Sequence, residues 1–240
     1  MNASRKIAIF VGILYIIATV AGMLSLPFTE PALNAPDYLV QVSASENQVI
    51  VGALLELLLA VAVASIGFAV YPVLRKHNAS IAIGYVGARV VEGVIFIFGV
   101  ISLLTLLTLG QEFVKAGTPA ASYFQTLGEL LLAARDWAGH VVLDVAVFTL
   151  GALIFNYLLY QSKLIPRWLA GWGFVGALLY WAAGLLVMFA IIKPLATTHI
   201  VLQAPLGVQE MVFAVWLIVK GFNPKAIVSE SAIAEINEKV

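Results

Sequence analysis

The sequence of 240 residues contains no cysteine and few charged residues. Without cysteine, the chain can form no disulfide framework, thiolate metal site or thiol nucleophile, and it can carry no lipidated cysteine. Charged residues make up 11% of the chain, whereas a soluble domain carries roughly 25%. The charges of the 13 basic and 13 acidic side chains cancel, so the net charge is zero. This balance excludes a basic nucleic-acid-binding protein and an acidic tail protein, and the low share of charged residues excludes a disordered chain.

Apolar residues make up 62% of the sequence, and the mean hydropathy is +1.02. Six apolar stretches are near or above the ~20 residues that a helix needs to cross a bilayer. Backbone groups in lipid must be hydrogen-bonded within their own segment, and the alternating pattern of a barrel strand is absent. We therefore predict an all-α integral membrane bundle of six transmembrane helices, over residues 7–26, 47–74, 81–109, 135–160, 168–191 and 202–220.

The first stretch has two interpretations, because Arg5 and Lys6 before an apolar run are also typical of a signal peptide. The run over residues 7–26 is longer than the roughly 7–15 residues of a signal-peptide core, and no A-x-A cleavage site follows it. We predict a retained helix and a single transmembrane domain over residues 1–222, with a short cytoplasmic tail at 223–240.

Basic residues predict the orientation of the bundle. Three Lys and Arg residues fall on one side of the predicted spans, and nine fall on the other. The positive-inside rule puts the richer side, with both termini, in the cytoplasm, and an even number of spans agrees. The richer side carries Arg5, Lys6, Arg75, Lys76, Lys163, Arg167, Lys220, Lys225 and Lys239.

The segments between the spans give further expectations. Pro27, Pro31 and Pro36 predict that residues 27–46 do not form a continuous helix. Segment 119–134 either lies along the outer interface or extends the fourth span outward.

Two glycine-rich pieces and one histidine also lie in or near the spans. Gly84–Gly87 and Gly171–Gly176 follow no strand, so we predict glycines that pack helices together rather than a phosphate-binding loop. His199 is expected in a loop.

Six ionisable residues inside the predicted spans form the candidate site. A charged group at mid-membrane costs about 2.5–3.5 kcal/mol on insertion scales. These side chains must therefore face the interior of the bundle and find partners there. The predicted binding residues are Glu56, Arg89, Glu92, His140, Asp144 and Glu210.

Helical spacing brings polar residues onto common faces. Asp136, His140 and Asp144 follow one another at intervals of four residues, and Gln203 shares a face with Glu210. With ~1.5 Å of rise per residue, the site residues are expected along a column that runs from the outer face to below the membrane centre. A cavity open to the outside would hydrate such a column.

Charge counting favours a binding function. The column holds four carboxylates but one obligate cation, Arg89, which we expect to neutralise Glu92 or Glu210. At least two of the other carboxylates must be protonated, hydrated, paired with a charged His140 or bound to a cation. We therefore favour a net-anionic intramembrane pocket that binds or transports a proton, a cation or a small polar solute.

Two alternatives stay open. One is a membrane-embedded, metal-dependent hydrolase acting near the outer leaflet, for which His140, Asp144 and Glu56 are weak metal candidates because a single histidine is poor for zinc. The other is a non-catalytic structural or regulatory subunit, and for Arg89 with Glu92 alone we favour such a helix-locking role. The sequence points to no cofactor. The expected partners are the lipid bilayer and a small cation or polar solute, without nucleic acid.

Several pieces of the chain resemble domain of unknown function family 4386, a family of multi-pass bacterial membrane proteins. The resemblance covers about residues 5–222 and implies a bundle of six or seven helices in a prokaryotic cytoplasmic membrane. It implies no activity. The matching pieces are Arg5-Lys6 before the first helix, Ala88–Gly93 in the third, Leu164–Leu169 before the fifth, Pro205–Glu210, and Lys220-Gly221-Phe222 at the end.

Overall fold

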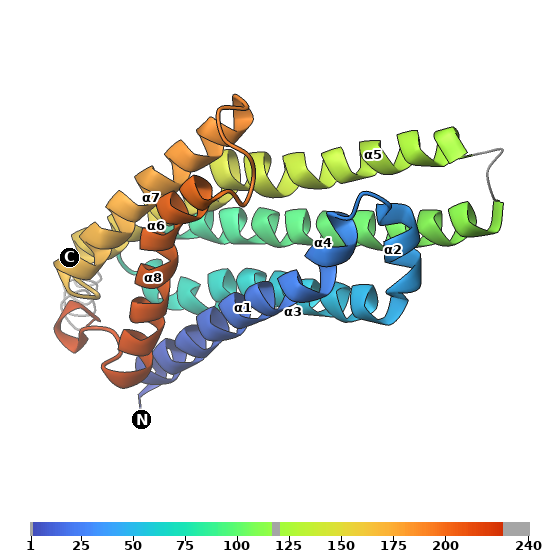
Figure 1. The fold of residues 1–240 in the computed structure, drawn as a ribbon. Helices are drawn as coiled ribbons and strands as arrows, with labels where there is room; N and C mark the ends of the chain where they lie inside the picture. The colour runs from blue at the N-terminus through green and yellow to red at the C-terminus, as the bar shows by residue number, and fades with distance from the viewer. Residues whose placement is uncertain (1, 117–120, 228–240) are drawn as a thin grey trace.

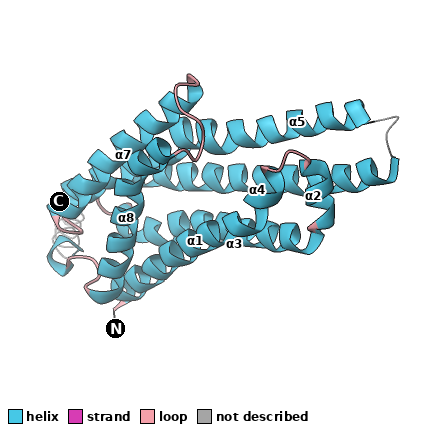
Figure 2. Ribbon diagram, in the orientation of Figure 1, coloured by secondary structure: helices cyan, strands magenta, loops and turns pink. Residues whose placement is uncertain are grey.

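The computed structural model of the protein describes residues 2–116 and 121–227, and within them it contains helices and no strand (Figure 2). This confirms the all-helical prediction, while the predicted tail beyond residue 227 lies outside the described residues. The elements are α1 (Ala3–Leu33), α2 (Tyr38–Ala44), α3 (Glu46–Leu74), α4 (Ala79–Ala116), α5 (Ala121–Trp137), the π-helix η2 (Ala138–Val147), α6 (Phe148–Ser162), α7 (Arg167–Met188) and α8 (Thr197–Val219).

Six helical segments are long and apolar enough to cross a membrane: α1, α3, α4, the continuous run Ser122–Ser162, α7 and α8. Large apolar side chains on these segments face outward, as for Met23 at 67% exposed and Phe68 at 62%. Charged side chains are buried instead, with Arg89 at 4% exposed and Asp144 at 2%. Polar groups inside and apolar groups outside suit lipid, in which a charge facing the hydrocarbon is costly. The chain is a multi-pass membrane protein, as predicted.

Helix α1 begins, and α8 ends, at the same end of the bundle, which we call the terminal end (Figure 1, left). Arg5, in the first turn of α1, donates hydrogen bonds to the carbonyls of Leu217, Ile218 and Val219 at 3.0, 2.6 and 3.1 Å. The last carbonyls of a helix have no partner within the helix and carry partial negative charge. The guanidinium of Arg5 therefore caps the C-terminal end of α8 and links this helix to α1.

The opposite end, called the far end, extends beyond the length that a bilayer requires. Helix α4 has 38 residues, or about 57 Å, against a hydrocarbon core of about 30 Å. Helix α2 packs on the last part of α4, and its Tyr38 hydroxyl donates to the carbonyl of Gln125 in α5 at 3.1 Å. Residues 121–134 form most of α5 and continue into η2 and α6, so they extend the fourth span; residues 119 and 120 lie outside the described part.

The prediction that residues 27–46 do not form a continuous helix is confirmed, because residues 34–37 separate α1 from α2, but the break does not fall at the first two prolines. Helix α1 continues through Pro27 and Pro31, although a proline has no N–H to donate to the preceding turn. Tertiary packing accounts for the difference, because Thr29 is fully buried and a Cβ on Gly52 of α3 would overlap its side chain. Proline is tolerated in membrane helices where neighbouring groups support the backbone.

The glycines in the spans fall into two groups. At Gly173 and Gly176 a Cβ would collide with α6 or α8, so these glycines allow close helix packing as predicted. At Gly84, Gly87 and Gly171 a Cβ would meet no atom within 4 Å, so the packing prediction was wrong there. A glycine inside an apolar helix does not reveal which side faces a neighbour.

Replacing Gly12 by alanine should destabilise the contact between α1 and α8. The new Cβ would lie 2.7 Å from the backbone oxygen of Ala214, and overpacking of this kind costs about 1–3 kcal/mol. Gly84→Ala is the matched control, because its Cβ enters open space. Thermal unfolding in detergent should show a lower midpoint for Gly12→Ala and an unchanged one for the control; equal midpoints for both variants would contradict this packing.

Candidate functional site

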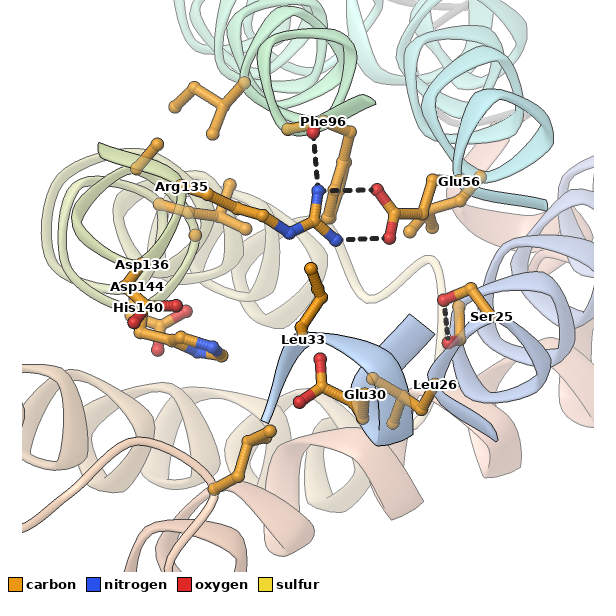
Figure 3. A pocket seen from close by; sticks show the side chains of 18 of the residues that line it. Ser25, Leu26, Glu30, Leu33, Glu56, Phe96, Arg135, Asp136, His140 and Asp144 are labelled. Carbon is orange, nitrogen blue, oxygen red and sulfur yellow. Dashed lines mark hydrogen bonds and ion pairs between the residues drawn. The ribbon is translucent and has the colours of Figure 1, made fainter. Parts of the chain in front are cut away.

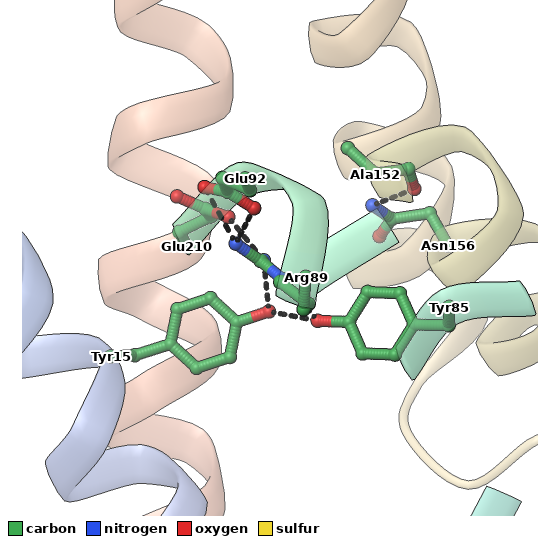
Figure 4. Close-up of polar contacts among 7 residues, drawn as sticks. All are labelled: Tyr15, Tyr85, Arg89, Glu92, Ala152, Asn156 and Glu210. Carbon is green, nitrogen blue, oxygen red and sulfur yellow. Dashed lines mark hydrogen bonds and ion pairs between the residues drawn. The ribbon is translucent and has the colours of Figure 1, made fainter. Parts of the chain in front are cut away.

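The guanidinium of Arg89 in α4 lies at the centre of a polar cluster formed by three helices (Figure 4). Its Nη1 donates to both carboxylate oxygens of Glu92, at 3.2 and 2.9 Å. Its Nη2 donates to Glu210 of α8 at 3.3 Å and to the hydroxyl of Tyr15 in α1 at 2.8 Å. Its Nε donates to the hydroxyl of Tyr85 at 2.8 Å. One side chain thus links α1, α4 and α8.

This cluster combines deep burial with an imbalance of charge. Arg89 and Glu92 are each 4% exposed, and the side chain of Glu210 is 16% exposed. Two carboxylates face one guanidinium, so the formal charge is −1 when all three groups are ionised. Arg89 lies about 15 Å along α4 from the terminal end, near the middle of a bilayer core. We predicted that Arg89 neutralises Glu92 or Glu210, and the structure places both carboxylates in contact with its guanidinium.

A cavity of about 350 Å³ lies between this cluster and the far end. Figure 3 shows side chains that line it. Residues from α1, α3, α5, η2 and α8 form its polar wall. Four of them are acidic and one is an arginine. The acidic, basic and histidine residues that line it are Glu30, Glu56, Arg135, Asp136, His140 and Asp144.

Glu56 has a partner that the sequence did not predict. Arg135 at the end of α5 donates to both oxygens of Glu56, at 2.5 and 3.1 Å, and also to the carbonyl of Gly99 in α4 at 2.5 Å. Arg135 is the first residue of the span predicted at 135–160, a position that gave no indication of a buried partner. Glu56 and Arg135 are 79 positions apart, and helical periodicity carries no information about such a pairing.

The π-helix η2 carries His140 and Asp144 on the cavity wall. π-Helices are rare, occur mostly as single turns within α-helices and are frequent at functional sites. Here the N–H of Phe148 bonds to the carbonyl of Leu143, five residues earlier, and the hydroxyl of Thr149 donates to the carbonyl of Asp144. Both bonds connect residues five positions apart, at the end of η2 that follows Asp144. Asp136, His140 and Asp144 line the same cavity, as the four-residue spacing predicted (Figure 3).

Asp144 contacts two residues of α8. Gln203 donates to its Oδ2 at 2.9 Å, and the Nε2 of His199 lies 3.4 Å from the same oxygen. The backbone N–H of Leu195 donates to the Nδ1 of His199 at 3.1 Å. The Nε2 of His199 also lies 3.0 Å from the amide nitrogen of Gln203, so His199, Gln203 and Asp144 form one polar group between α8 and η2.

The position of His199 corrects the sequence prediction, which put it in a loop. It lies in the first turn of α8 and is fully buried. Its ring packs edge-on against His140, with centroids 5.9 Å apart. The short polar run before α8 resembled a loop in sequence, and the carboxylate that His199 faces comes from η2.

A further cavity of about 270 Å³ adjoins the first one and holds the Arg89 cluster. Tyr15, Arg89, Glu92 and Glu210 line it. The two cavities share lining residues, which include Phe96, Leu143 and Tyr180. The six site residues chosen from the sequence therefore line two adjoining compartments that extend from the middle of the bundle toward its far end.

The residues named as metal candidates do not form a set of ligands in the described part of the chain. Within residues 2–116 and 121–227, no three His, Asp or Glu side chains are grouped so that they could hold a metal ion. The Glu56 carboxylate is held by Arg135, whereas Asp144 contacts Gln203 and His199.

The fold and the site define a helical, multi-pass membrane protein with a buried polar centre. The family described as domain of unknown function (DUF4386) matches residues 10–221, and the chain belongs to this family. No curated protein and no solved structure matches the chain.

Replacing Arg135 by glutamine should destabilise the bundle by about 3–5 kcal/mol, because it leaves Glu56 as an uncompensated buried charge. The double variant Glu56→Gln/Arg135→Gln should recover most of this loss, since neither charge then remains. Equilibrium unfolding in detergent measures both. Lys115→Gln, which breaks an exposed pair with Glu112, should change the free energy of unfolding by less than about 1 kcal/mol. A double variant no more stable than Arg135→Gln would contradict the pairing.

Proposed function

We propose that the protein binds a small organic cation, such as a protonated amine, in the cavity toward the far end and transports it across the membrane. The observation that carries the proposal is the charge of the cavity wall. Glu30, Glu56, Asp136 and Asp144 are opposed by Arg135 alone among the described lining residues, which leaves a formal charge of −3 with neutral histidines. A low-dielectric cavity of this charge attracts cations strongly.

The dimensions and polarity of the cavity fit a small solute. About 350 Å³ lies at the lower end of the range for small-molecule sites, roughly 300–1,000 Å³. Apolar side chains such as Leu143 and Phe96 line it beside the carboxylates. An alkylammonium ion has a cationic head for the carboxylates and a short apolar part for these side chains.

The Arg89 cluster supplies a candidate site for proton exchange. Its formal charge of −1 is buried at mid-membrane, where an uncompensated charge is costly. We infer that one proton is shared between Glu92 and Glu210. Glu210 lines the cavity of about 270 Å³. This cavity adjoins the proposed solute-binding cavity of about 350 Å³, so a proton can reach Glu210 from there. Transport coupled to protons fits this arrangement, because entry of a cation and loss of a proton leave the total charge unchanged.

The two alternative functions have less support. A metal-dependent hydrolase has no ligand set among the described residues. A purely structural role fits Arg89, which joins three helices, but it gives no account of the acidic cavity beside the cluster. The locking role and the binding role can coexist, because they use different residues.

We also propose that the terminal end faces the cytoplasm of a prokaryotic cell, because that end is rich in Lys and Arg. The absence of cysteine allows a direct test with single cysteines. In intact cells, a membrane-impermeant maleimide should label Lys115→Cys at the far end and should label Lys76→Cys only after the cells are lysed. The reverse pattern would show that the terminal end faces outward.

Binding of alkylammonium ions, from methylammonium to tetraethylammonium, tests the proposed function. Calorimetry on the purified protein should detect binding of at least one of these ions, and Asp136→Asn and Asp144→Asn should each weaken it at least tenfold, or about 1.4 kcal/mol. Proteoliposomes should take up the bound ion, and the same variants should slow its uptake.

Glu112→Gln is the matched control, because it also removes one carboxylate but lies outside the cavity, in an exposed pair with Lys115. Thermal unfolding of each variant separates loss of binding from loss of fold. Absence of binding across the series, or equal weakening by Glu112→Gln, would overturn the proposal.

A further inference from the structure

A separate cavity, which we call the basic cavity, lies at the terminal end of the bundle. It has a volume of about 490 Å³ and forms where the turn between α6 and α7 meets the end of α8. Lys163 lines it from the turn, Arg167 from the start of α7, and Lys220 from the end of α8. The proposed solute cavity shares none of these residues.

The walls of the basic cavity are held in place by packing and hydrogen bonds. Leu164 and Ile165 of the turn are almost fully buried, at 0% and 2% exposed. After α8 the chain returns to this turn, where the N–H of Asn223 donates to the carbonyl of Leu164 at 2.8 Å and its side chain donates to the carbonyl of Lys163 at 3.2 Å. Lys163 ends α6 with a φ of 56°, the left-handed conformation with which helices commonly terminate, and this turns the chain into the wall of the cavity.

No nearby carboxylate offsets the cations of the basic cavity in the described part of the chain. Residues 2–8, 70–82, 160–170 and 216–227, which form the terminal end, contain no Asp or Glu. None of the three lining cations forms an ion pair with a described residue. The other basic residues at this end are Arg5, Lys6, Arg75, Lys76 and Lys225.

The location of the basic cavity matches the depth of lipid headgroups. It lies where α6, α7 and α8 reach their ends, and Trp168 and Trp216 stand beside it with ring centroids 6.5 Å apart. Tryptophan is enriched at this depth in membrane proteins. On the same two helices Val175, Val215 and Val219 are more than half exposed, and they offer an apolar surface to an acyl chain.

We propose that the basic cavity binds the phosphate of an anionic phospholipid, with its acyl chains on the outer surface of α7 and α8. Three cations from three segments converge on one cavity at headgroup depth, and pockets of this kind between membrane helices bind anionic headgroups. The site does not depend on the proposed transport of cations, because it uses other residues at the opposite end of the bundle.

Native mass spectrometry of the protein with phosphatidylglycerol tests the proposal. The wild type should bind phosphatidylglycerol at least tenfold more tightly than phosphatidylcholine. Lys163→Gln/Arg167→Gln should weaken the binding of phosphatidylglycerol at least fivefold, and Lys220→Gln should weaken it measurably. Arg75→Gln/Lys76→Gln removes the same two residue types at the same end but outside the cavity, and should change the affinity by less than about twofold.

The controls distinguish binding in the basic cavity from nonspecific electrostatic attraction of anionic lipid to the terminal end. Equal weakening by both double variants would mean that the overall positive charge of the terminal end is enough to bind the lipid. No weakening by either would mean that phosphatidylglycerol does not bind in the basic cavity. Each result overturns the proposal. Glycerol 3-phosphate should not compete at the same concentration, and equal competition would identify a site for soluble phosphates instead. Unchanged unfolding midpoints in phosphatidylcholine show that the variants fold, while Lys220→Gln tests the cavity without altering the turn.

Discussion

The requirement that a charge inside a bilayer be compensated within the protein determines how this bundle is built. Arg89 cannot lose its proton, so its position at mid-membrane forces other helices to bring acceptors to it. Glu92 on its own helix, Glu210 on α8 and the two tyrosine hydroxyls supply them. Replacing this centre by apolar side chains would not be costly in itself, since buried ion pairs contribute little net stability. Its value is to fix which helices lie together.

The acidic cavity depends on the same constraint but meets it incompletely. Arg135 compensates Glu56, and Gln203 and His199 contact Asp144, but these contacts do not neutralise the wall. The π-helix η2 directs His140 and Asp144 into this space, and α7 packs closely behind it, where a Cβ on Gly184 would lie 2.9 Å from the Cβ of Asp144. A π-helix beside uncompensated carboxylates supports the proposed binding of a cationic solute, because π-helices are frequent at functional sites.

Hydropathy was sufficient to predict the six spans, and charge inside the spans was sufficient to select residues that the fold brings together. The span predicted at 47–74 and the observed helix Glu46–Leu74 agree to one residue, because apolar length is a local property. The partners were harder to predict. The pairing of Arg135 with Glu56 and the burial of His199 depend on contacts between helices that are distant in sequence, while the helical path through Pro27 depends on packing against α3.

In the function we propose, the Arg89 cluster holds a proton at neutral pH, because one guanidinium cannot balance two buried carboxylates. Infrared difference spectroscopy of the protein in lipid measures this directly through the carbonyl stretch of a protonated carboxylic acid. We predict that the wild type shows this band at neutral pH and that Glu210→Gln removes it, since Arg89 then balances Glu92 alone. A wild-type spectrum without the band, or a band that persists unchanged in both Glu92→Gln and Glu210→Gln, would contradict the account.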